Sequence, residues 1–74
     1  MKLPRLSGKK LVKILSAQGF DSVRQKGSHV IMIKEIDGKK VHTVVPLHNE
    51  IDKGTLLEII RQCGMKRDEF LELL

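Results

Sequence analysis

His29 is the residue in this sequence whose type and setting best suit proton-transfer chemistry. It lies between a Gly-Ser pair and an unbroken apolar run, and the basic residues Arg24, Lys26 and Lys34 are close to it in the chain. Histidine accepts or donates a proton near neutral pH, and lysine or arginine neutralises phosphate charge. RNA can be cleaved without a metal when its 2′-hydroxyl attacks the adjacent phosphate, which requires a base, an acid and positive charge. This stretch is therefore a candidate site for RNA cleavage.

The same residues also have an explanation that involves no chemistry. His29 has the position of an ordinary residue at the start of a strand, at the margin of the core. Side chains alternate between the two faces of a strand, so Arg24, Lys26 and Lys34 cannot all flank it. Alternation places Lys34 on the other face of the strand, with Val30 and Met32. Spacing alone leaves open which of Arg24 and Lys26 faces the histidine.

Other polar residues could take part in such a site. Ser28 could donate its hydroxyl to a phosphate, although a serine after Gly27 is also a common turn residue. His48 lies in an expected loop and is a candidate second proton-transfer group if the fold brings it near His29; otherwise it is an exposed loop histidine. His42 has the opposite parity to its apolar neighbours, so we expect it to be structural or solvent-facing.

Metal and cofactor chemistry have little support in the sequence. The three histidines and Cys63 do not occur at the i, i+4 or Cys-x-x-Cys spacing of structural metal sites. There is also no P-loop, no Gly-rich dinucleotide fingerprint and no nucleophile elbow. We therefore expect neither a metal nor a small-molecule cofactor.

Composition and charge describe a small globular domain with an anionic partner. Of the 74 residues, 41% are apolar and 31% are charged, and the net charge is +5. Lys and Arg are concentrated in residues 1–40, whereas residues 41–74 are net acidic. This polarity favours nucleic acid as the partner. The single cysteine, and the lack of an apolar stretch typical of a signal peptide or membrane span, lead us to expect a soluble cytoplasmic protein that binds no membrane.

Apolar spacing and turn residues predict the elements that position these side chains. A first helix is expected between Ser7 as N-cap and Gly19 as C′ residue. Its apolar residues fall on one face, and Lys9 and Lys13 fall on the other, where they are either solvated or in contact with phosphate. Strands are expected at 20–26, 29–36 and 41–46, with turns at 27–28 and 37–38.

The last part of the chain is predicted to be helical. A second helix begins after Asp52 and ends at Gly64, and a short third helix begins at Arg67 or Asp68. The order α-β-β-β-α predicts a single α+β domain over residues 1–74, with helices on one face of a three-stranded antiparallel sheet. The other sheet face must contact water or a partner, and it is the candidate working surface.

Several stretches resemble the HicA-type toxins, the small partners of bacterial and archaeal HicA–HicB toxin–antitoxin pairs. These stretches are GFDSVRQKGSHVIM, VVPLH, GTLLEIIRQCGM and the final DEFLEL, and they occur in the order and spacing of that family. The Arg-Gln-Lys-Gly-Ser-His string is the most specific of them. The resemblance covers nearly the whole chain.

The resemblance implies a fold like that of a double-stranded-RNA-binding domain. It implies an mRNA interferase, which is a metal-independent endoribonuclease that stops growth by cleaving mRNA, with His29 as the catalytic residue. It also implies a HicB-like antitoxin that covers the active site. The residues that we expect to contact RNA are Arg24, Lys26, Gly27, Ser28, Lys34, Lys9 and Lys13.

Two positions depart from the family pattern. Met32 stands where an aromatic residue is common, which weakens the expectation of base stacking. Cys63 stands where a small residue such as alanine is common, which is typical of tolerated core variation. Two other functions also fit the charge and the element order. One is a non-catalytic double-stranded-RNA-binding module, and the other is a basic surface that serves mainly to dock an antitoxin.

Overall fold

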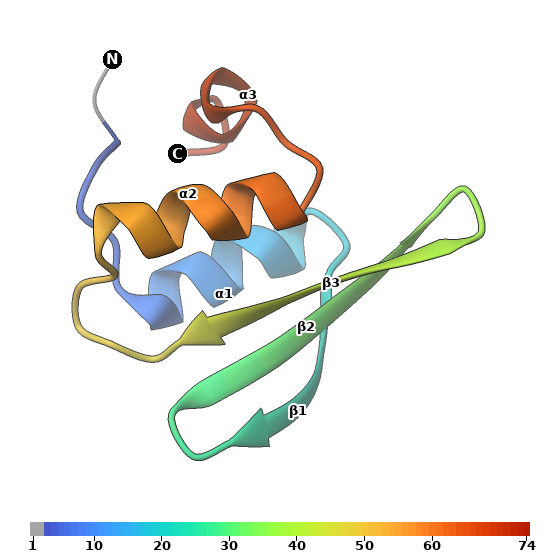
Figure 1. The fold of residues 1–74 in the computed structure, drawn as a ribbon, viewed down its shortest axis with the longest axis horizontal. Helices are drawn as coiled ribbons and strands as arrows, with labels where there is room; N and C mark the ends of the chain where they lie inside the picture. Colours follow the sequence, from blue (N-terminus) through green and yellow to red (C-terminus); the bar gives the residue numbers. More distant parts are fainter. Residues whose placement is uncertain (1–2) are drawn as a thin grey trace.

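The computed structural model describes residues 3–74 as one helix, a three-stranded sheet and two further helices (Figure 1). The elements are α1 (Gly8–Ala17), β1 (Asp21–Lys26), β2 (His29–Ile36), β3 (Lys39–Pro46), α2 (Lys53–Gln62) and α3 (Arg67–Leu71). The strands pair antiparallel in the order β1-β2-β3. This confirms the predicted α+β class and its similarity to a double-stranded-RNA-binding domain. Within residues 3–74, no helix is long and apolar enough to cross a membrane.

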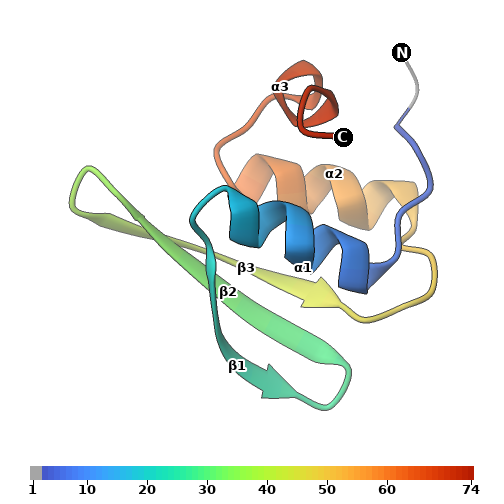
Figure 2. The same ribbon diagram turned by 180° about the vertical axis from the view of Figure 1, so that it is seen from behind.

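The two longer helices cover one face of the sheet. In both views α1 and α2 lie side by side above the strands, and α3 packs beyond α2 (Figures 1 and 2). Between these layers lies an aliphatic core with two phenylalanines, Phe20 and Phe70. The strands contribute alternate residues to it, namely Val30 and Met32 from β2 and Thr43 and Val45 from β3. Among residues 3–74 no helix covers the opposite sheet face, which stays open, as predicted.

The predicted N-caps are both confirmed. Ser7 Oγ accepts a hydrogen bond of 3.1 Å from the backbone N–H of Lys10, and Asp52 Oδ2 accepts one of 3.0 Å from the N–H of Thr55. These bonds satisfy N–H groups that the first turn of a helix leaves without a partner. Both helices therefore begin where the sequence predicts.

The predicted strand boundaries differ slightly from the observed ones. β3 begins at Lys39 rather than at residue 41, because Asp37 and Gly38 have φ values of 50° and 79°. Two positive φ values in a row are typical of a tight turn that lets pairing start at once, and Ile36 pairs with Lys39. β1 begins after Phe20, whose ring is buried in the core.

A close approach between Gly8 and the end of β3 holds α1 in place. The N–H of Gly8 donates a hydrogen bond of 2.9 Å to the carbonyl of His48. A Cβ at this position would collide with the carbonyl oxygen of Pro46 and lie 2.7 Å from Cα of Leu47. Only glycine lets the helix start this near the strand, so the position of α1 over the sheet depends on that residue.

Candidate nucleic-acid interface

A tight turn determines where His29 begins β2. Gly27 has a φ of 61°, which glycine adopts without strain and which suits the first central position of a type II′ hairpin turn. The amide of Gln25 donates a 3.2 Å hydrogen bond to the carbonyl of Gly27, and the N–H of Leu47 donates one of 2.6 Å to the carbonyl of Ser28. The turn is thus held from both β1 and the segment after β3.

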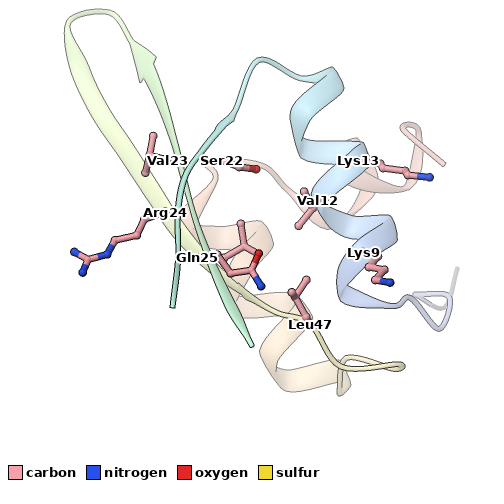
Figure 3. A pocket seen from close by; sticks show the side chains of 9 residues that line it. Lys9, Val12, Lys13, Ser22, Val23, Arg24, Gln25 and Leu47 are labelled. Atoms are coloured by element: carbon pink, nitrogen blue, oxygen red, sulfur yellow. The ribbon is translucent and has the colours of Figure 1, made fainter. Parts of the chain in front are cut away.

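The strand register places two cations on the face of His29. Lys26 pairs with His29, and Arg24 pairs with Ile31. Residues directly opposite each other in an antiparallel pair project to the same side of the sheet. Figure 3 shows the Arg24 side chain pointing away from α1, toward the open face. Both Arg24 and Lys26 therefore share the open face with the histidine, which answers the question that spacing left open.

Lys34 lies on the opposite face of β2, beneath the helices. Its Nζ is 5.8 Å from the centroid of the Phe20 ring, a cation–π distance, and its stem packs against the turn at Gly19. The structure does not bring Lys34 to the face of His29. Met32 is also on the covered face and is fully buried. An aromatic residue at that position would join the core, so this departure from the family pattern concerns packing rather than base stacking.

The open face combines a cationic edge with an aliphatic centre. Ile31 and Ile33 of β2 are half-buried on this face, and Val44 of β3 pairs with Ile31 and is 39% exposed. His29 itself is exposed rather than at the margin of the core. Arg24 and Lys26 are exposed too, so RNA can reach both of them from this side.

The other two histidines differ in their distance from His29. His42 is exposed and pairs with Ile33, so it lies on the open face but about 13 Å farther along β2 by strand rise. His48 is also exposed, and it follows Pro46, which pairs with His29. The segment that carries His48 therefore passes beside the Gly27-Ser28 turn, and the role of His48 in proton transfer stays a prediction.

A groove separates α1 from β1 on the helix-covered side of the sheet (Figure 3). It has a volume of about 540 Å³. Lys9 and Lys13 form its rim on α1, and Ser22 and Gln25 of β1 point toward α1 in Figure 3. Arg24 also borders the groove, but its side chain points away from α1, so Lys9 and Lys13 lie on the opposite side of β1 from the guanidinium of Arg24 and from Lys26. The structure therefore has two basic clusters. Arg24 and Lys26 form one on the open side of the hairpin, and Lys9 and Lys13 form the other on the side of α1.

Sequence reasoning did not single out Gln25 or the groove. Gln25 lies between Arg24 and Lys26 in the strand, so its side chain points to the opposite face from theirs. This alternation was the signal in the sequence that Gln25 faces α1. The sequence pattern does not predict the distance between α1 and the edge of the sheet, so it does not predict the groove. In the part of the chain that the structure describes, no three His, Cys, Asp or Glu side chains lie together as metal ligands.

A family model described as the HicA toxin of bacterial toxin–antitoxin systems matches residues 8–65. This segment is most of the chain and contains the whole hairpin around His29. The chain belongs to the HicA toxin family. No curated protein and no solved structure matches it. Membership in the HicA family makes this chain the toxin of a toxin–antitoxin system and implies an antitoxin partner.

Proposed function

We propose that this HicA-family toxin is a metal-independent endoribonuclease that cleaves mRNA in the cytoplasm. The observation that carries the proposal is the pairing of Lys26 with His29. It puts an exposed imidazole next to a cation at the edge of an open sheet face. An imidazole that accepts a proton and a cation that neutralises phosphate are two of the groups that RNA cleavage requires.

In the proposed reaction His29 acts as the general base. It accepts the proton of the 2′-hydroxyl, and that oxygen forms a bond to the adjacent phosphorus. The bond from phosphorus to the 5′-oxygen then breaks, and the leaving oxygen takes a proton from a general acid, for which His48 is our candidate. The products are a 2′,3′-cyclic phosphate and a 5′-hydroxyl.

Arg24 and Lys26 would hold the phosphate during this reaction. Neither of them has an ion-pair partner among residues 3–74, so both charges are available to RNA. The exposed turn contributes in a different way. We propose that Gly27 provides the backbone shape and that Ser28 donates its hydroxyl to a phosphate oxygen. Gly27 is required for its φ rather than for space, since a Cβ there would meet nothing within 4 Å.

RNA that extends past the hairpin would meet the second basic cluster. Lys9 and Lys13 lie one turn apart on α1 and are exposed. We propose that they contact phosphates flanking the cleaved one. In this proposal Lys34 does not contact RNA, because its cation–π contact with Phe20 lies on the covered face of the sheet.

We also propose that the partner is a HicB-like antitoxin that inhibits by covering the open face. The aliphatic centre of that face, with Ile31, Ile33 and Val44, suits a protein interface better than it suits RNA. Acidic groups on the same partner would meet Arg24 and Lys26 in place of phosphate.

The experiment that tests the function is incubation of the purified protein with end-labelled mRNA, with and without EDTA. We expect cleavage in both arms and fragments that carry 2′,3′-cyclic phosphate ends. The element order also fits a non-catalytic double-stranded-RNA-binding module. That alternative predicts intact RNA after prolonged incubation, together with binding to duplex RNA whose affinity falls steeply with salt. Intact RNA would overturn the proposed function.

A further inference from the structure

β1 is an edge strand without a neighbour on its outer side. All six of its residues are exposed, and its one partner in the sheet is β2. Figures 1 and 2 show no described element beyond it. The outer backbone N–H and C=O groups of an edge strand are a template for pairing with an extended chain, and β1 offers a regular one at residues 24–26, beyond the irregularity between Ser22 and Arg24.

The groove beside this strand has an aliphatic floor. Val12, Val30 and Leu47 line it, and Val23 on β1 is 54% exposed at its border. A volume of about 540 Å³ accommodates several aliphatic side chains. A strand added to β1 would send alternate side chains toward α1, which is the direction of this floor.

The rim of the groove is basic. Lys9 and Lys13 of α1 are exposed, and neither has an ion-pair partner among residues 3–74. A positively charged rim around an apolar floor selects an occupant that carries acidic groups and aliphatic groups together. It also disfavours pairing between two copies of this chain through β1, because their lysines would repel each other.

We propose that this groove and the outer edge of β1 are a second docking site for the antitoxin, occupied by an extended segment whose groove-facing side chains include both acidic and aliphatic ones. A protein segment fits better than RNA because the groove contains no aromatic side chain on which a base could stack. The free N–H and C=O groups of the strand edge can pair with a polypeptide backbone, whereas RNA has no peptide groups to pair with them. The inference rests on the proposed function in one respect, which is the identity of the partner.

Such an antitoxin would contact both faces of the β1–β2 hairpin, which carries His29. One part would cover His29 on the open face, and the extended segment would lie behind β1 against Lys9 and Lys13. The two contacts would be linked through a single chain, so each would raise the effective concentration of the other. The groove would then contribute to inhibition without touching the reacting groups.

The site can be probed with a synthetic peptide and isotope-labelled full-length protein. The peptide is capped at both ends and is about as long as an average strand. It carries valine and glutamate by turns at every second position, with serine between them, so that both can face the groove. The protein carries His29→Ala, so that binding is read independently of cleavage. We expect the peptide to shift the amide signals of β1 and of α1 around Val12. The same peptide with serine in place of each valine should bind about tenfold more weakly, because it leaves the aliphatic floor empty.

Charge reversal on the rim has a matched control elsewhere in the chain. Lys9→Glu with Lys13→Glu should weaken binding of the glutamate–valine peptide by about tenfold. Lys39→Glu with Lys40→Glu makes the same change in net charge at the β2–β3 turn and should leave it nearly unchanged. Equal losses in the two double variants would overturn the proposal, since attraction would then be non-specific. Shifts outside β1 and α1, or no shifts, would also overturn it.

A third probe distinguishes the peptide from RNA and separates this inference from the proposed function. Val12→Thr keeps the shape of the side chain but makes the floor polar; we expect weaker peptide binding and unchanged cleavage of mRNA in the protein that retains His29. If an oligouridylate shifts the groove amides more strongly than the peptide does, the groove is an RNA channel and the inference is wrong. If the peptide binds as described but mRNA stays intact, the proposed function fails alone.

Discussion

Lys26 stands directly across the β1–β2 hairpin from His29, so that its ammonium group and the imidazole leave the sheet on the same exposed face. Lys34 is about as near to His29 in the sequence, yet it lies on the covered face and contacts Phe20. The difference follows from alternation along β2 and from the register of the hairpin. Two lysines with similar spacing from His29 thus have different roles.

These two lysines predict different phenotypes. In a His29→Ala background, Lys26→Ala should weaken RNA binding about threefold to tenfold and reduce the dependence of log affinity on log salt by about one unit. Lys34→Ala should leave RNA affinity unchanged and lower the free energy of unfolding by about 0.5–1 kcal/mol through loss of the cation–π contact. Fluorescence anisotropy at several salt concentrations and chemical denaturation measure the two effects. Equal loss of RNA affinity in both variants would contradict this assignment.

A second prediction concerns the contact between α1 and the end of β3. Alanine usually stabilises a helix relative to glycine. Gly8→Ala should instead destabilise the protein by about 1–3 kcal/mol, because the new methyl group would collide with the Pro46 carbonyl. Gly54→Ala in α2 is the control, since its Cβ would meet only a carboxylate oxygen of Asp52 at 3.4 Å. Urea denaturation should show opposite signs for the two variants; a stabilised Gly8→Ala would refute the close approach.

A third prediction concerns the acid sensitivity of α2. The hydroxyl and the backbone N–H of Thr55 donate to Asp52 at 2.7 and 3.0 Å and hold the pKa of that carboxyl below its usual value. A depressed folded-state pKa gives stabilisation that is present above the unfolded-state pKa and is lost as the pH falls through the folded-state value.

Asp52→Ala should therefore lower Tm by a few degrees at neutral pH, and the difference from the wild type should shrink as the solution is acidified below the ordinary carboxyl range. Asp52→Asn keeps a capping oxygen that does not titrate, so its effect should depend less on pH. Thermal unfolding followed by circular dichroism measures all three proteins. A difference that stays constant or grows on acidification would contradict a lowered pKa for Asp52.

A fourth prediction concerns Cys63. Burial raises the pKa of its thiol to about 11, and the charge of Lys34 offsets only part of this effect. The thiol should stay protonated near neutral pH and react with iodoacetamide only when the protein unfolds. Its stabilising contribution is complete below the unfolded-state pKa and is lost as the pH rises through about 11. Rapid alkylation of the folded protein would show that Cys63 is accessible.

Much of the fold is readable from local patterns. Ser7 and Asp52 cap the helices as predicted, and Gly27 and Asp37-Gly38 form the two hairpin turns. These features depend on a few adjacent residues, so sequence is sufficient to find them. The boundaries of β2 are predicted for the same reason, since turns lie at both of its ends.

The remaining features depend on contacts between distant parts of the chain. Alternation along the strands places Lys34 and Lys26 on opposite sheet faces only once the pairing of β1 with β2 is known. The groove exists because Gly8 sets α1 against Pro46 and Leu47 while β1 extends beyond the helix layer. Parity places Gln25 on the side of α1, but no local pattern predicts how far apart helix and strand lie. Tertiary packing therefore determines the groove beside Lys9 and Lys13, whereas their shared helix face is readable from the sequence.

The most direct test of the central claim is cleavage of labelled mRNA by the wild type, His29→Ala and His42→Ala. His42 is a matched control because it is an exposed histidine on the same sheet face. We expect His29→Ala to lose cleavage by about a hundredfold or more, with an unchanged circular dichroism spectrum, and His42→Ala to cleave like the wild type. Full cleavage by folded His29→Ala protein would contradict the assignment of His29 as the catalytic base.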